Sequence, residues 1–234
     1  MNTPLLLWNG LFLAVTAALL LAPMWPAWQE WRRPKDLASQ PLQNSTAPTA
    51  AEVPATQRIW VRPGSHFRQL VARQILFGDN TAATPHPVQH HTLPALHVPT
   101  HWPHATRWGE QGWRIEGDCQ VPAGHRLDGP LVVIGDLWLA HDSLVTGDLK
   151  VHGHVRLAPR AVITGALTCP NDIHLGEACA VQGPVLCAGL LRLGDAVRLG
   201  SPEHATSVWA DHILVEASAT AHGSVCASAS GQVA

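Results

Sequence analysis

Residues 112–201 alternate apolar and polar positions in blocks of six. Fifteen such blocks follow one another from Gly112 without an insertion or a deletion. The fourth place of each block is aliphatic or cysteine, and the second place is apolar except at His125 and Ser143. This alternation predicts a short strand with one buried face in every block. Glycine holds the last place of eight blocks, so we expect a corner with a positive φ at that place.

The size of the side chain at the second place repeats every three blocks. One of the three series is small apart from its first member; it consists of His125, Ser143, Ala161, Cys179 and Val197. The other two series carry bulkier residues such as Leu149 and Ile173. Three strands and three corners therefore make one turn of 18 residues, which predicts an all-β fold, a parallel triangular β-helix solenoid. A sandwich of hairpins would instead show uneven strand spacing and two-residue turns.

The repeat continues beyond Ser201 after an interruption. The five residues SPEHA shift the phase, and we expect them to form a loop at a corner. The β-helix domain then extends over 112–229, with Ile213 and Val215 facing inward. Its last coil is built from alanine, serine and glycine, without a polar helix to close it, so its edge could serve as a template for another copy. We therefore expect end-to-end self-association through Ala219, Ala221, Val225 and Ala227.

The N-terminal region has the pattern of a membrane anchor. Residues 5–24 carry no charged side chain and are long enough to cross a bilayer, which predicts a transmembrane helix over 5–27. The residues Trp25, Trp28, Arg32, Arg33 and Lys35 follow it as an interfacial and basic flank. The positive-inside rule then places the domain after the anchor in the cytoplasm, at the inner membrane of a Gram-negative cell. A cleaved signal peptide would need a basic n-region and a small-residue cleavage site, and neither is convincing.

Three segments connect the anchor to the repeat. Residues 28–58 are rich in Pro, Ala, Ser and Thr and predict a disordered linker. Residues 59–80 form a basic amphipathic segment, for which we expect a helix from Ser65 to Gly78. This helix would either lie on an anionic membrane or cover the open end of the solenoid.

The third segment, 81–111, is a His/Pro-rich linker. Its histidines are His86, His90, His91, His97, His101 and His104. Histidine-rich tracts can bind zinc, nickel or copper. This tract lacks the regular spacing of a helical metal site, and its prolines oppose a regular element, so we expect a linker without a dedicated metal site.

Charge and chemistry narrow the possible functions. A formal net charge of −2 gives no reason to expect nucleic-acid binding. Four of the five cysteines, Cys119, Cys169, Cys179 and Cys187, hold inward places and are expected to be small apolar fillers in a reducing compartment. The aspartates stand at first places beside corners, where Asp favours turns, rather than gathered on one face as acid/base or calcium chemistry requires. We expect no catalytic residue, no cofactor and no metal.

Two polar features remain open at this stage. His125 is either buried and hydrogen-bonded or turned outward in a distorted first coil. The outward places of one face carry Arg156, His174 and Arg192 in successive coils. This column could bind an anion or an acidic partner, although solvated charge on a strand face is the ordinary situation.

The six-residue repeat, as in GPLVVIGDLWLAHDSLVTGDLKVHGHVRLAP, behind an anchor and a Pro-rich linker resembles the bactofilins. These are bacterial polymer-forming cytoskeletal proteins. The resemblance covers about residues 112–229. It implies a right-handed β-helix that stacks end to end into filaments without nucleotide, and a membrane-bound, non-enzymatic scaffold that localises cell-envelope proteins or influences cell shape.

Two other functions also fit the sequence. The left-handed hexapeptide helix of acyltransferases also repeats every six residues, and His204 in SPEHA would then be the candidate catalytic histidine. Bulky residues at two of three second places would crowd that narrower prism. The other alternative is a membrane-tethered adaptor that does not polymerise.

Overall fold

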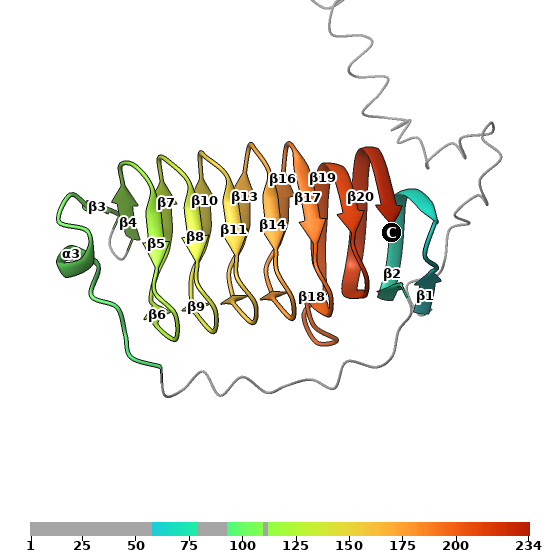
Figure 1. The fold of residues 1–234 in the computed structure, drawn as a ribbon, viewed down its shortest axis with the longest axis horizontal. Helices are drawn as coiled ribbons and strands as arrows, with labels where there is room; N and C mark the ends of the chain where they lie inside the picture. Colours follow the sequence, from blue (N-terminus) through green and yellow to red (C-terminus); the bar gives the residue numbers. More distant parts are fainter. Residues whose placement is uncertain (1–57, 79–92, 110–111) are drawn as a thin grey trace, which may run out of the picture. The chain divides into compact units, whose positions relative to one another are not determined.

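The described residues of the computed structural model, 58–78, 93–109 and 112–234, build a parallel β-solenoid (Figure 1). It has about nine turns of about 18 residues each. The predicted transmembrane helix 5–27, its flank from Trp25 to Lys35 and all but the last residue of the linker 28–58 lie outside the described residues. Within the described ranges, no helix is long and apolar enough to cross a membrane.

The repeat supplies fifteen short strands. They are β4 (Gly112–Ile115), β5 (Cys119–Val121), β6 (Arg126–Leu127), β7 (Leu131–Val133), β8 (Leu137–Leu139), β9 (Leu144–Val145), β10 (Leu149–Val151), β11 (Val155–Leu157), β12 (Val162–Ile163), β13 (Leu167–Cys169), β14 (Ile173–Leu175), β15 (Ala180–Val181), β16 (Val185–Cys187), β17 (Leu190–Leu193) and β18 (Val197–Leu199). Each of them corresponds to one block of six residues.

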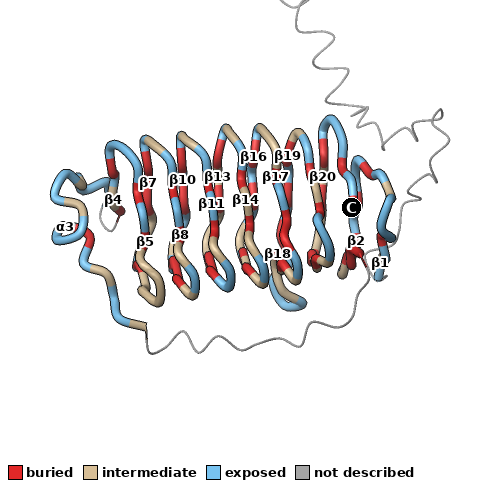
Figure 2. The backbone as a smooth tube through the Cα atoms, viewed as in Figure 1, coloured by how far each residue is buried: buried red, intermediate tan, exposed pale blue. Residues whose placement is uncertain are grey.

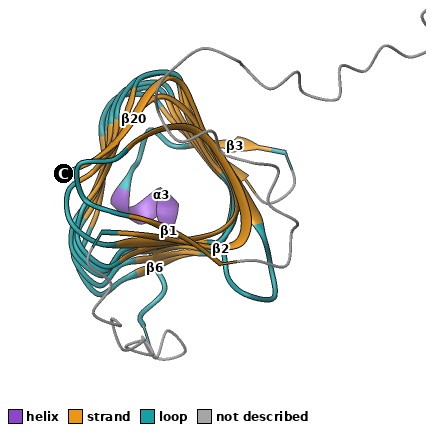
Figure 3. Ribbon diagram, turned by 90° about the vertical axis from the view of Figure 1, so that its right-hand side faces the viewer, coloured by secondary structure: helices purple, strands orange, loops and turns teal. Residues whose placement is uncertain are grey.

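Strand pairing confirms the period of 18 residues. Every repeat strand pairs in parallel with the strand three places along the chain; Leu149, for example, is in register with Leu131 and with Leu167. Viewed along the solenoid axis, the strands of successive turns superimpose (Figure 3). Equivalent residues therefore stack into columns that run the length of the domain.

The second and fourth places of the blocks face the interior. Their side chains are buried in one continuous hydrophobic core, and buried and exposed residues alternate along the strands (Figure 2). Leu167, Ile173 and Leu191 are completely buried. Burying one such side chain contributes roughly 1.5–3 kcal/mol, so the stacked columns dominate the stability of the fold.

The corners differ from the expectation based on glycine. Most glycines at the last place of a block have an ordinary φ; Gly147, Gly165 and Gly183 are examples. A Cβ atom at any of these three would lie less than 3.0 Å from the backbone of the preceding coil. Glycine is needed there because two coils approach closely at the corner.

A regular series of positive φ angles occurs at another corner. It lies at the first place of every third block and consists of Gly124, Asp142, Arg160, Ala178 and Ala196. In three successive coils the residue after this position donates its N–H to a carbonyl three residues earlier, as in Ser143 to Ala140. This is a β-turn with the left-handed conformation at its third residue. Four of the five residues are not glycine, so side-chain type alone does not mark this corner.

The SPEHA insertion forms the expected loop. The strand β19 (Thr206–Val215) pairs with β16 through Val185 and Val208, which are 23 residues apart instead of 18. The five extra residues leave the solenoid between β18 and β19. The last strand, β20 (Ala219–Val233), then returns to a parallel pairing with β18 and β19. The solenoid thus continues to Val233, beyond the predicted boundary at residue 229.

A strand from the beginning of the described chain closes the C-terminal end. The strand β2 (His66–Phe77) pairs antiparallel with β20, and β1 (Arg58–Val61) pairs in parallel with β2 (Figure 1). The predicted helix between Ser65 and Gly78 was therefore wrong, although one of its two proposed roles, covering the end of the solenoid, is what the segment does. The rings of Phe67 and Phe77 lie 5.4 Å apart at this end of the core.

The physical reason for the error is a pair of irregularities in β2. The pairing with β20 shifts between Phe67 and Gln69 and again between Ala72 and Ile75. At the first shift two residues of β2 span five of β20, and at the second three residues of β2 span two of β20. The buried positions of β2 therefore recur at Phe67, Leu70, Ala72 and Ile75 rather than at every second residue. A bulged strand thus imitates the three-to-four-residue spacing of an amphipathic helix.

The N-terminal end is also closed. The single turn α3 (Val98–His101) places Val98 in the core, and β3 (Thr106–Trp108) pairs antiparallel with β4. The backbone of Leu96 donates to the carbonyl of Arg126 in the first coil, at 2.7 Å. The predicted linker 81–111 is therefore part of the domain from Leu93 to Gly109, because its apolar residues cover the first coil.

Candidate interaction surfaces

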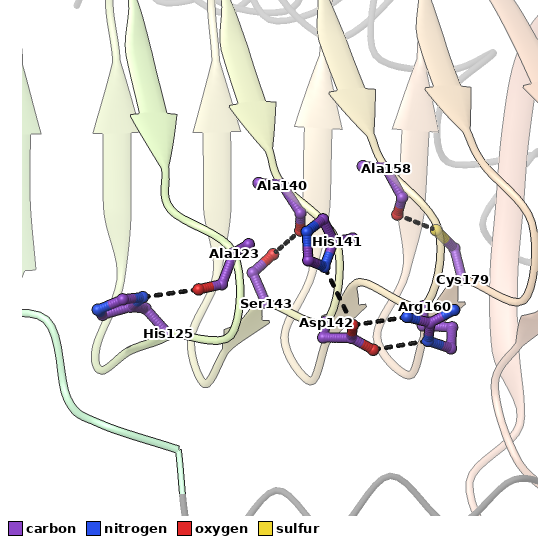
Figure 4. A network of polar contacts seen from close by, with 9 residues as sticks. All are labelled: Ala123, His125, Ala140, His141, Asp142, Ser143, Ala158, Arg160 and Cys179. Atoms are coloured by element: carbon purple, nitrogen blue, oxygen red, sulfur yellow. Dashed lines mark hydrogen bonds and ion pairs between the residues drawn. The ribbon is translucent and has the colours of Figure 1, made fainter.

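The polar corner residues fasten one coil to the next. The carboxylate of Asp142 accepts two hydrogen bonds of 2.6 Å from the guanidinium of Arg160, one coil further on (Figure 4). The hydrogen bond from Arg160 is the main cause that lowers the pKa of Asp142 to about 2. Both residues hold the left-handed position of their turns. Their charge is thus used within the solenoid.

Aspartates at another corner accept backbone hydrogen bonds. The N–H of Asp136 donates to the carboxylate of Asp118 at 2.9 Å, and the N–H of His154 donates to that of Asp136 at 2.7 Å. The same contact joins Leu190 to Asp172, at 2.8 Å. These carboxylates satisfy N–H groups at corners, where the strand pairing is interrupted. The expectation that the aspartates are corner residues is met in this form.

The inward cysteines are buried and free. Burial raises the pKa of Cys119 to about 12 and the pKa values of Cys169 and Cys179 to about 11. The thiol of Cys179 donates to the carbonyl of Ala158 at 3.1 Å (Figure 4). Neutral thiols held in this way are poor nucleophiles and fill space, as expected.

The two polar residues at inward places have backbone partners. His125 is half-buried, and its Nδ1 contacts the carbonyl of Ala123 at 2.8 Å. Ser143 is completely buried and donates its hydroxyl to the carbonyl of Ala140 at 2.7 Å (Figure 4). Both side chains stabilise the turn that precedes them, and neither is directed at another titratable side chain.

The predicted outward column is present on the face that contains β8, β11, β14 and β17. Arg156 is in register with Trp138 on one side and with His174 on the other, and His174 is in register with Arg192. The pKa of His174 is lowered, mainly by burial. Glu216 opposes this shift, and the neighbouring Arg192 and Arg156 add to it. Arg192 forms an ion pair of 3.3 Å with Glu216. The column is a straight, mixed cationic and aromatic ridge.

The described histidines of the former linker do not gather around one point. His97 contacts the hydroxyl of Thr100 at 2.9 Å, and the ring of His101 lies edge-on to Trp102. Among the described residues, no group of three or more His, Cys, Asp or Glu side chains could hold a metal ion. His86, His90 and His91 lie outside the described residues, as do the anchor-flank residues.

The predicted self-association residues lie beneath β2. Ala219, Ala221, Val225 and Ala227 are all buried, and the first three are in register with Phe77, Ile75 and Leu70. These four residues therefore do not form the open end that the prediction assumed. The sequence shows no cap after the last coil because the cap precedes the repeat in the chain.

Sequence reasoning expected the first closing segment to cover an end of the solenoid but gave it the wrong secondary structure, and it missed the second segment. The signal for the first was present in the apolar residues of 66–77, but its bulges gave it a helical spacing. The signal for the second was the apolar series Leu96, Val98 and Trp102, which the histidines and prolines around it obscured.

The chain was compared with protein-family models, with curated proteins and with solved structures. No family model matches it, and neither a curated protein nor a solved structure matches.

Proposed function

We propose that this chain is a bactofilin-like, non-enzymatic scaffold, tethered to the inner membrane by residues 5–27, whose right-handed β-solenoid presents its side faces to cell-envelope proteins. One observation carries the proposal. Segments that precede the repeat close both ends, so the long side faces are the largest surfaces left for partners.

The distribution of polar groups supports a scaffold. Carboxylates at the corners bind N–H groups or arginines of the neighbouring coil, and the interior titratable groups are thiols with raised pKa values. A side face such as the ridge from Trp138 to Arg192 repeats one residue per coil. A rigid array of this kind suits recognition of an extended partner.

Filament formation through the C-terminal end requires β2 to leave. Twelve residues of β2 pair with or cover β20, and Ile75 and Phe77 are buried there. A second copy could reach the edge of β20 only after these contacts break. The closed ends therefore favour the adaptor form of the scaffold over an end-to-end polymer.

The test is the assembly state of the full chain in detergent, measured by sedimentation velocity and electron microscopy. We expect single particles over a wide concentration range. The double variant Phe67→Asp and Ile75→Asp, which places charge under β2, should instead associate. Filaments of the unmodified chain would contradict the adaptor form. Alkaline phosphatase fused after Ala234 tests the tether, because high phosphatase activity would contradict a cytoplasmic domain.

A further inference from the structure

The C-terminal end of the solenoid carries four exposed arginines. Arg58 belongs to β1, Arg62 follows it, and Arg68 and Arg73 belong to β2. All four are exposed. Residues 58–78 contain no Asp or Glu, and neither does the neighbouring stretch 217–234. The three outermost strands at this end are therefore purely cationic in their side chains.

Several arginines of the inner coils are paired with carboxylates, although among the described residues Arg156 and Arg198 form no ion pair. Arg114, Arg126, Arg160 and Arg192 each form an ion pair with a carboxylate. Within the described ranges, no ion pair joins any of the four arginines of the C-terminal end to a carboxylate. Their charges are thus free to act on a partner outside the molecule.

Apolar side chains are exposed on the same two strands. Trp60 is 59% exposed and Val71 is 45% exposed. The indole nitrogen of Trp60 donates to the carbonyl of Gly78 at 2.7 Å, which fixes the ring on the outside of the last turn. Arginine, tryptophan and aliphatic side chains exposed on the same strands are the combination found where proteins meet the headgroup region of a bilayer.

We propose that this end, formed by β1, β2 and the turn between them, docks on an anionic phospholipid surface. The inference deepens the proposed function, since it rests on a scaffold that works at the membrane. Each arginine close to an anionic leaflet strengthens binding about fivefold, so four act over several hundredfold at low salt. The attraction falls off within a Debye length of about 8–10 Å, which requires the end itself to face the lipid.

The positive charge of this end also argues against a second copy of the chain as the partner that docks there. A second copy docked end to end on the same face would bring four unpaired arginines against four more, in the geometry of a two-fold contact. An acidic protein would satisfy the charges but gives no role to the exposed Trp60 and Val71. A lipid surface accounts for both observations.

The experiment measures hydrogen exchange of the full chain with vesicles of phosphatidylcholine alone and with vesicles of equal parts phosphatidylcholine and phosphatidylglycerol. Peptides from residues 58–77 report on the docking end, and peptides from 149–163 report on the inner coils. We expect exchange in 58–77 to slow about tenfold in the anionic vesicles alone. High salt should reverse the effect, while exchange in 149–163 stays the same in all conditions.

Matched variants separate a local site from general charge. The triple variant Arg58→Gln, Arg68→Gln and Arg73→Gln should lose the lipid-dependent protection. The triple variant Lys150→Gln, Arg156→Gln and Arg198→Gln removes the same number of charges from the side faces. It should retain the lipid-dependent protection of 58–77. Equal loss in both variants would overturn the proposal, as would exchange in the unmodified chain that does not differ between the two lipids.

Two further readouts keep this proposal distinct from the tether. Flotation with phosphatidylcholine vesicles that resists alkaline extraction reports the anchor alone, so a failed anchor and a failed docking end give different results. The hydrogen-exchange experiment is also repeated with soluble polyglutamate, which represents an acidic protein partner. Protection of 58–77 by polyglutamate but not by anionic vesicles would assign the surface to an acidic protein and refute the lipid.

Discussion

Gly165 provides a direct test of why glycine recurs at the corners. A Cβ at this position would lie less than 3.0 Å from the backbone carbonyl of Gly147 and from the N of Asp148, one coil earlier. These are backbone atoms held by strand pairing on both sides, through β9 with β12 and β10 with β13. The substitution Gly165→Ala must therefore push two coils apart or distort the corner.

The magnitude follows from two opposing effects. Alanine reduces the entropy of the unfolded chain, which by itself stabilises by about 0.4–1 kcal/mol at a position with an ordinary φ. Overpacking against atoms that cannot move costs roughly 1–3 kcal/mol. Since the nearest atoms belong to the backbone, we expect the steric cost to win and the free energy of unfolding to fall by about 1–2 kcal/mol.

The assay is urea denaturation of the full chain in detergent, followed by far-ultraviolet circular dichroism. Gly194→Ala is the graded control, because its Cβ would lie 3.0 Å from the nearest atom, the carbonyl oxygen of Leu175. We expect a smaller loss there. If Gly165→Ala is as stable as the unmodified chain, close approach of the coils is not what requires glycine at this corner.

The other predictions concern the core, the turns and acid stability. Leu167→Ala, in a completely buried column, should lower the free energy of unfolding by roughly 2–5 kcal/mol. Ser143→Ala should lower it by only about 0.5–1.5 kcal/mol, because it removes one hydrogen bond to the turn. Similar losses in urea titrations would show that the columns are assigned wrongly. Ala196→Gly should stabilise by about 0.5–1 kcal/mol because it relieves a positive φ, while Ala158→Gly at an ordinary φ should not; thermal unfolding of both decides the question. The pKa of Asp142 is lowered to about 2, so its contribution to the stability of the fold is present above its unfolded pKa near 4 and is lost as the pH falls towards 2. Asp142→Asn should therefore flatten the pH dependence of stability in that window. An unchanged slope would contradict the role of Arg160.

The repeat could be predicted because its signal is local. Alternation of apolar and polar residues within six positions determines which side chains face inward. The size of the side chain at the second place of every third block determines how the coils stack. Residues such as Leu149 and Cys179 were therefore placed correctly. The predicted SPEHA loop followed from the same register.

The strand structure of the closing segments could not be predicted because their partners are distant in sequence. The β2 pattern is intelligible only beside β20, whose register makes the two irregularities visible. The left-handed turns escaped for another reason. Arg160 and Ala178 have no intrinsic preference for a positive φ, and the stacking of successive turns imposes it on them.

The pairing of β2 with β20 has a consequence for the order in which the molecule is completed. His222 contacts the carbonyl of Arg73 across 149 residues of chain, at 3.1 Å. A ribosome releases β2 well before β20, so β2 waits for this partner while the coils between them form from local contacts. A chain that ends before β20 leaves β2 paired only with β1, with Phe67, Ile75 and Phe77 accessible to chaperones and proteases. Closure of the C-terminal end therefore follows the formation of the coils.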